Sequence, residues 1–367
     1  MKTDAKKSRK GLKITAIIIG VIAVIICSAL VAVGILTAPI DDSSEKAVAV
    51  GGLLKSENFD YQADSAKDLE KNPMIKIMQI VWKFCAKSDA AVHAKQTPPD
   101  NLTKEYDIPY IDDGNRYHML DVYYPENATE KMPVIIDIHG GGWMYGDKSL
   151  NEYYNLALAD RGFVVFSISY RLVPDVTVNE QLWDCMEALK WISDNMNNYP
   201  CDSDNIMLTG DSAGGMFAAY CAVLLQSEEL RNVFEVTDAD LELTALLLTS
   251  PVPNMNVDGD IMMKKFYWGK DYQSKATYKY MNLDEIIDYA ELPPTYLITS
   301  SGDSAHSSTV ATYELLKAKG VDAELKDYSD LRDDKALPHV FSVLEPFDEF
   351  GSKAIDGALG FYRKNMK

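Results

Sequence analysis

Apolar and polar positions along the chain predict strands and helices in alternation. Mostly apolar runs predict buried strands at residues 133–139 and 163–170 and further strands at residues 205–209, 241–249, 295–299 and 323–328, and residues 117–124 predict an edge strand. Helical spacing predicts helices over residues 151–160, 180–196, 213–226, 309–319 and 348–362. Apolar strands that alternate with helices are typical of a mostly parallel central sheet with helices on both faces, so the predicted class is α/β.

A long uncharged run lies near the N-terminus. Residues 14–36 hold 23 consecutive uncharged positions, about 34 Å as a helix, which is enough to cross a bilayer core of about 30 Å. Residues 1–13 hold six basic side chains against one acidic one, which predicts a cytoplasmic N-terminus and an external main domain. The alternative is a signal peptide with secretion after cleavage, but its apolar core usually has only about 7–15 residues.

These patterns predict four parts. They are a basic cytoplasmic tail at 1–13, a transmembrane anchor at 14–36, a stem with N-terminal cap helices at 37–99, and the α/β domain at 100–367. Residues 73–95 have the apolar spacing of an amphipathic helix. Residues 252–292, rich in aromatic and methionine side chains, interrupt the strand pattern. We interpret them as a small cap over the site, with residues 73–95 as a second contributor; ordinary core packing is the alternative.

Charge and composition narrow the class of protein. The formal net charge is −19 and hydrophobic residues make up 47% of the 367 positions. The hydrophobic fraction excludes a disordered chain, and the acidic balance argues against a nucleic-acid partner. The five cysteines match no metal-ligand spacing and no disulfide framework, so we interpret them as free thiols.

One glycine-rich turn carries the pattern of a serine nucleophile. Gly210-Asp211-Ser212-Ala213-Gly214-Gly215 lies between a predicted strand and a predicted helix. Glycines two residues before and after the serine allow the sharp turn that exposes its Oγ. A glycine-rich turn capped by the serine is the alternative interpretation, and a phosphate-binding loop is excluded because no lysine follows at the required place.

A second glycine cluster follows another predicted strand. His139-Gly140-Gly141-Gly142-Trp143 comes directly after the apolar run at 133–139. Consecutive glycines let backbone N–H groups face a ligand closely, as an oxyanion requires. The alternative interpretation is a mobile turn without a catalytic role. We expect His139 to hold this loop in place rather than to transfer a proton.

A nucleophilic serine needs an imidazole base and a carboxylate that orients it. His339 lies in the loop after the last predicted strand, and Asp303 lies just beyond the strand at 295–299. The order Ser212, Asp303, His339 is the one expected for this architecture. The alternatives are a helix N-cap role for Asp303 and a structural role for His339, while His306 could line the pocket.

These motifs resemble the α/β-hydrolase superfamily, specifically its hormone-sensitive-lipase-like esterase branch. The resemblance rests on HGGGW, GDSAGG, Tyr170-Arg171-Leu172, Asp303 and His339-Val340-Phe341, and it covers roughly residues 105–365. Ser-Ala-His follows Asp303 where the family commonly has Pro-Leu.

The resemblance implies an α/β-hydrolase fold with Ser212 as nucleophile, His339 as base and Asp303 as the orienting acid. It also implies an oxyanion hole formed by the N–H groups of Gly141, Gly142 and Ala213, with no metal or organic cofactor. The predicted function is a membrane-anchored serine hydrolase of small or short-chain acyl esters that works through an acyl-enzyme. An amidase or peptidase on the same fold, or a non-catalytic binding module, are the alternatives; the oligomeric state stays open.

Overall fold

The computed structural model describes residues 28–38, 40–41, 49–55, 63, 67, 69, 72–254 and 261–367. The predicted basic tail and residues 14–27 of the predicted anchor lie outside this part of the chain. Residues 28–36 are helical, with the apolar side chains of Leu30, Val31 and Ile35 more than half exposed. Among the described residues no helix has both the length and the apolar character needed to cross a bilayer. The anchor therefore stays a prediction.

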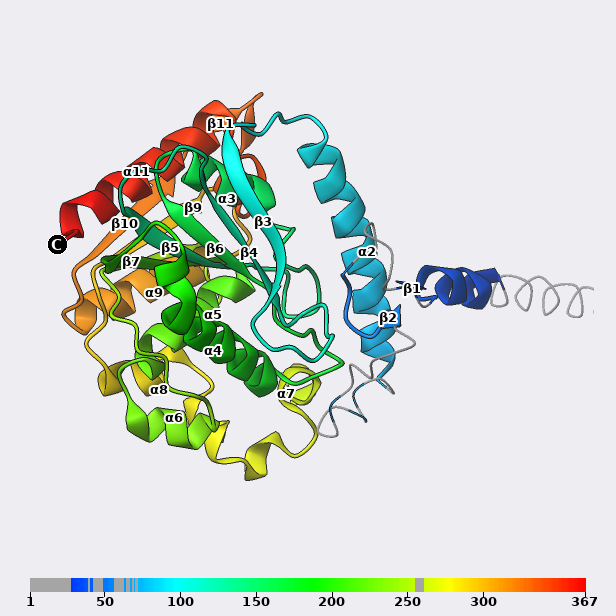
Figure 1. Cartoon of the computed structure of the whole chain (residues 1–367). Coiled ribbons are helices and arrows are strands. Elements are labelled where there is room, and N and C mark those ends of the chain that lie inside the picture. The colour runs from blue at the N-terminus through cyan, green and yellow to red at the C-terminus, as the bar shows by residue number, and fades with distance from the viewer. Residues whose placement is uncertain are drawn as a thin grey trace, which may run out of the picture.

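An eight-stranded sheet forms the centre of the molecule (Figure 1). Its order is β10-β9-β8-β7-β5-β6-β4-β3, and all neighbours from β10 to β6 are parallel. The strands are β3 (Leu102–Pro109), β4 (Met119–Pro125), β5 (Met132–Ile138), β6 (Val164–Ile168), β7 (Cys201–Asp211), β8 (Ala245–Thr249), β9 (Thr295–Ser300) and β10 (Ala323–Tyr328). The prediction of a mostly parallel sheet is confirmed.

The edge of the sheet differs from the prediction. The strand expected at the edge is β4, which is antiparallel to β6 and is covered on its other side by β3. β3 has the sequence LTKEYDIP. Only its first residue, Leu102, is fully buried, and the other residues are half-buried or exposed. Such a polar run lacks the apolar signal of a strand, and this is why the pattern did not predict it.

Helices cover both faces of the sheet because the strand residues alternate between two cores. In β5, Val134 and Ile136 join one apolar cluster and Ile135 joins the other. The first cluster includes α4 (Val178–Asn195), α5 (Ala213–Leu224) and α9 (His306–Ala318), and the second includes α3 (Glu152–Ala159) and α11 (Glu349–Asn365).

Smaller elements complete the domain. They are α6 (Glu228–Phe234), α7 (Ile261–Trp268), α8 (Leu283–Ile286), α10 (Phe341–Leu344), the 3-10 helices η3 (Met196–Asn198), η4 (Tyr272–Ser274), η5 (Ala276–Tyr280) and η6 (Ile287–Tyr289), and the strand pairs β1 (Ile40–Asp41) with β2 (Leu54–Lys55) and β11 (Leu331–Arg332) with β12 (Lys335–Ala336).

The topology places two loops side by side. From β5 the chain moves to β6 on one side and later returns to β7 on the other side of β5. The loops that follow β5 and β7 therefore leave the same edge of the sheet in opposite directions, and such a switch point opens a crevice in α/β folds.

The long helix α2 (Pro73–His93) precedes the sheet in sequence and lies along the side of the domain (Figure 1). It starts where expected because the Asn72 side chain accepts a hydrogen bond from the N–H of Met74 and Pro73 occupies the first helical position.

Candidate active site

Ser212 lies at a sharp turn between β7 and α5. Its φ is 51° and its ψ is −116°, a combination that costs a residue with a side chain about 1–3 kcal/mol. The flanking glycines are required by space: a Cβ on Gly210 would lie 2.3 Å from the Gly214 oxygen, and a Cβ on Gly214 would lie 2.0 Å from the Ile138 oxygen. The turn thus holds Ser212 at the end of β7, above the switch point.

The structure brings the three predicted residues Ser212, His339 and Asp303 together. The Nε2 of His339 lies 3.0 Å from the Ser212 Oγ, and its Nδ1 lies 2.6 Å from Asp303 Oδ1. Asp303 follows β9, and His339 lies in the loop between β12 and α10. Three loops distant in sequence thus form one hydrogen-bonded chain from a carboxylate through an imidazole to a hydroxyl, the arrangement that activates a serine.

Asp303 is held in its ionised form. Burial by itself would raise the pKa of its carboxyl, but hydrogen bonds from His339, Ser250, Thr299 and the backbone N–H of Ala305 outweigh that effect and lower the pKa to about 2. The Thr299 hydroxyl and the Ala305 N–H each donate at 2.7 Å. A permanent negative charge behind the imidazole fixes the proton on Nδ1 and leaves Nε2 free to accept the serine proton.

The glycine loop after β5 lies next to Ser212. The N–H of Gly140 donates to Asp211 Oδ1 at 2.9 Å, which ties this loop to the serine turn. Gly141 and Gly142 have φ values of 109° and 55°. A Cβ on Gly141 would lie 1.9 Å from the Tyr145 oxygen. Both positions therefore require glycine.

Gly141, Gly142 and Ala213 have backbone N–H groups that donate no hydrogen bond to another described residue. Ala213 is the first residue of α5, where N–H groups have no partner within the helix. Gly141 and Gly142 line the same cavity as Ser212. N–H groups placed in this way can stabilise an oxyanion.

His139 has the structural role expected for it. Its ring is buried and stacks on Tyr170 with 4.3 Å between the ring centroids. Burial lowers its pKa to about 4, so the ring is neutral at pH 7. The Tyr170 hydroxyl donates to the His139 carbonyl oxygen at 2.8 Å, which fixes the start of the glycine loop.

A buried acidic pair beneath the loop was missed by sequence reasoning. The Asn151 Nδ2 lies 2.8 Å from Asp211 Oδ1 and 3.1 Å from Asp137 Oδ2, so one amide joins the two carboxyls. Burial, with the nearby charge of Asp211, raises the pKa of Asp137 to about 7. Asp211 stands inside the recognised motif, but nothing in the pattern marked Asn151, because only the fold places α3 beside the end of β7.

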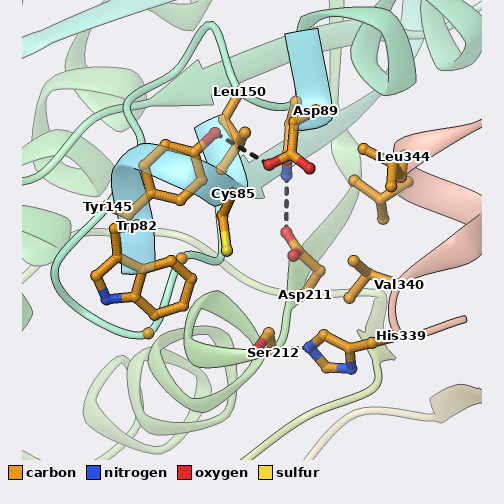
Figure 2. A pocket seen from close by; sticks show the side chains of 14 residues that line it. Trp82, Cys85, Asp89, Tyr145, Leu150, Asp211, Ser212, His339, Val340 and Leu344 are labelled. Atoms are coloured by element: carbon orange, nitrogen blue, oxygen red, sulfur yellow. Dashed lines mark hydrogen bonds between the residues drawn. The ribbon is translucent and has the colours of Figure 1, made fainter. Parts of the chain in front are cut away.

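A cavity of about 240 Å³ opens beside Ser212. Figure 2 shows Trp82, Cys85 and Asp89 of α2 above Ser212 and His339. The Tyr145 hydroxyl donates to Asp89 Oδ2 at 3.0 Å, and its ring stacks on Trp82 at 5.6 Å. Other lining residues include Leu150, Val340, Val343 and Leu344. One wall is therefore apolar and aromatic, while Asp89, Asn151 and Asp211 make the other polar.

The lining of this cavity shows that the prediction of a cap at residues 252–292 is wrong. Of the described residues in 252–292, none lines it, whereas α2 supplies three side chains. Phe266, Trp268 and Tyr272 are instead buried in the main apolar cluster. The aromatic content of this segment thus serves core packing, the alternative considered above. Tyr267 also contacts the glycine loop through the Trp143 ring, with 4.9 Å between the ring centroids.

Of the remaining candidates, His306, Cys185, Cys201 and Cys221 lie apart from the site, whereas Cys85 lines the cavity. The Nε2 of His306 lies 2.8 Å from Asp327 Oδ2, and His306 does not line the cavity. Cys85, Cys185, Cys201 and Cys221 are free thiols, and the fifth cysteine, Cys27, lies outside the described residues. Within the described part of the chain, no cluster of His, Cys, Asp or Glu is arranged to hold a metal ion.

Comparison with known proteins agrees with this geometry. The family model BD-FAE matches residues 120–258. The carboxylesterase NlhH of Mycobacterium tuberculosis is 27% identical over 250 residues, which cover 65% of this chain and 78% of that enzyme. The versiconal hemiacetal acetate esterase of Dothistroma septosporum is 24% identical over 275 residues, covering 70% of this chain and 80% of that enzyme.

A solved esterase matches almost over its full length. Esterase B from Lactobacillus rhamnosis, in a structure inhibited by a C4-C4 tributyrin phosphonate, superposes with a TM-score of 0.73 and 31% identity. The match covers 82% of this chain and 96% of that one.

Proposed function

Because the chain belongs to the esterase/lipase family of α/β-hydrolases and is a carboxylic ester hydrolase, we propose that Ser212, His339 and Asp303 are its catalytic residues. The observation that carries this proposal is the hydrogen-bonded chain from Asp303 through His339 to Ser212, with distances of 2.6 and 3.0 Å, at the edge of a cavity.

In the proposed mechanism the Ser212 Oγ attacks the ester carbonyl carbon while His339 Nε2 takes the hydroxyl proton. The oxyanion accepts hydrogen bonds from the N–H groups of Gly141, Gly142 and Ala213. The tetrahedral intermediate collapses, and His339 gives the proton to the departing alkoxide, which leaves as an alcohol. Water then attacks the acyl-enzyme, with His339 again as base, and releases the acid. Asp303, ionised throughout, stabilises the imidazolium that forms twice in the cycle.

We assign small or short-chain acyl esters as the substrate class. The cavity of about 240 Å³ is smaller than the roughly 300–1,000 Å³ typical of sites for drug-sized ligands. The phosphonate bound by the similar esterase B is named as a C4-C4 tributyrin analogue, which supports short acyl groups in this chain too.

We further propose that residues 14–36 anchor the enzyme in a membrane, with the N-terminus in the cytoplasm and the catalytic domain outside. The 23 uncharged positions, the preceding basic tail and the exposed apolar side chains of residues 28–36 support this topology. Protease treatment of intact cells should digest the domain, and protection until lysis would reverse the orientation.

Covalent labelling tests the catalytic assignment directly. The whole chain in detergent should react with a fluorescent phosphonate probe and hydrolyse short p-nitrophenyl esters faster than the matching anilides. Ser212→Ala should abolish both labelling and turnover. His339→Ala should do nearly the same, whereas the matched control His306→Ala should retain turnover, because His306 lies outside the cavity. Labelling that persists at another serine would overturn the assignment.

A further inference from the structure

The outer face of α2 exposes a row of apolar side chains. Ile77, Val81 and Phe84 are 55%, 44% and 62% exposed. They are four and three residues apart, so they lie on one face of the helix. Trp82, Cys85 and Asp89 point instead from the inward face of the same helix into the cavity (Figure 2). One helix thus separates the active site from an unpartnered apolar surface.

A row of lysines runs along one side of these apolar residues. Lys76, Lys83 and Lys87 are seven and four residues apart and share a face of α2. None of the three forms an ion pair with another described residue. The only acidic side chain of α2 is Asp89, which points inward. The outer face is therefore basic in a chain whose net charge is −19.

The position of α2 indicates what covers this face. Figure 1 shows the helix of residues 28–36 on the side of the domain that α2 covers, running away from the domain and across the direction of α2. If residues 14–36 cross a bilayer, α2 lies along the membrane surface with its outer face toward the lipid.

We propose that the outer face of α2 docks on an anionic lipid bilayer. Ile77, Val81 and Phe84 enter the boundary between headgroups and acyl chains, while Lys76, Lys83 and Lys87 contact lipid phosphates. Apolar side chains flanked by lysines on one helix are the pattern of a helix that lies in the membrane interface. This inference goes beyond ester hydrolysis and does not depend on the assignment of the triad, but it rests on the proposed membrane anchor.

Photocrosslinking to lipid tests the contact. The whole chain carries p-benzoylphenylalanine in place of Phe84, and the control carries it in place of Leu331, a residue of β11 that is 56% exposed. Both are irradiated with vesicles of phosphatidylcholine and phosphatidylglycerol. We expect lipid adducts at position 84 in several-fold excess over position 331. The expectation holds whether the anchor crosses the vesicle or not, because the lysines attract the anionic surface by themselves.

A triple variant tests whether the three lysines are needed for the contact with lipid. Lys76→Gln, Lys83→Gln and Lys87→Gln together should lower the adduct yield at position 84, by up to roughly fivefold for each lysine removed, and pure phosphatidylcholine vesicles should act similarly. Phosphonate labelling at the wild-type rate shows that each variant is folded. Equal yields at positions 84 and 331 would overturn the proposal. So would crosslinks at position 84 that join chiefly a second copy of the chain or another segment of the same chain.

Discussion

The positive φ of Ser212 leads us to a prediction about the stability of the fold that is separate from catalysis. Ser212→Ala and Ser212→Gly both remove the hydroxyl, so both variants should be inactive. Only Gly also removes the Cβ, which is the atom that makes a φ of 51° and a ψ of −116° unfavourable. The two variants therefore isolate the backbone strain stored at the nucleophile.

The size of the effect follows from two opposing contributions. Relief of the strained conformation should favour Gly by about 1–3 kcal/mol. The greater freedom of Gly in the unfolded chain costs about 0.5–1 kcal/mol. Ser212→Gly should thus be more stable than Ser212→Ala by about 1 kcal/mol, the middle of a range of about 0–2.5 kcal/mol, which corresponds to about 2 °C in Tm.

Calorimetry of the two variants in the same detergent measures this difference. The control is Ala311→Gly, added to Ser212→Ala, because Ala311 is an exposed residue within α9. There Gly should cost about 1 kcal/mol. If Ser212→Gly unfolds at or below the temperature of Ser212→Ala while the control behaves as expected, the turn holds no strain and the argument is wrong.

Three further predictions concern the triad and its glycines. Ser212→Ala and His339→Ala should each lower kcat by a factor of about 10⁴–10⁶, and steady-state kinetics should show the double variant to be no worse than the worse single one. The pKa of Asp303 falls from an ordinary 3.8 to about 2 on folding, so its charge stabilises the fold above about pH 4 and this stabilisation is lost as the pH falls through 2. The wild-type Tm should therefore drop more steeply over that range than the Tm of Asp303→Asn. Gly214→Ala, whose Cβ would lie 2.0 Å from a backbone oxygen, should lose about 3 kcal/mol in urea unfolding, whereas Gly360→Ala, with no atom within 4 Å, should gain about 0.5–1 kcal/mol.

The parts of the fold that carry a local signal could be predicted from the sequence. The runs that became β5 and β6 are buried on both faces, so they are mostly apolar, with Asp137 and Ser167 as the polar exceptions. Ser212 and the glycine loop were recognisable because close backbone approach demands glycine at fixed spacings. β3 carried no such signal, since an edge strand facing water needs no apolar run.

The walls of the cavity could not be predicted in the same way. Trp82 and Gly142 are sixty residues apart, yet a Cβ on Gly142 would lie 2.4 Å from the Trp82 ring. Aromatic residues at 252–292 looked equally suited to cover the site, and only the packing of α7 and α8 against the core distinguishes the two segments. Composition shows that a segment is apolar but does not show which surface it covers.

The position of α2 in the sequence has a consequence for how the substrate range of this enzyme can change during evolution. The helix that walls the cavity ends at His93, before the first strand of the sheet, while the nucleophile, base and acid all follow residue 200. Exchange or rewriting of one N-terminal segment would thus alter substrate choice without touching a residue that performs the chemistry. The opposite face of α2 is exposed, so substitutions there can change what the helix contacts outside the domain while the residues that line the cavity stay the same. Substrate selectivity and the proposed membrane attachment would then be inherited together on one short N-terminal segment.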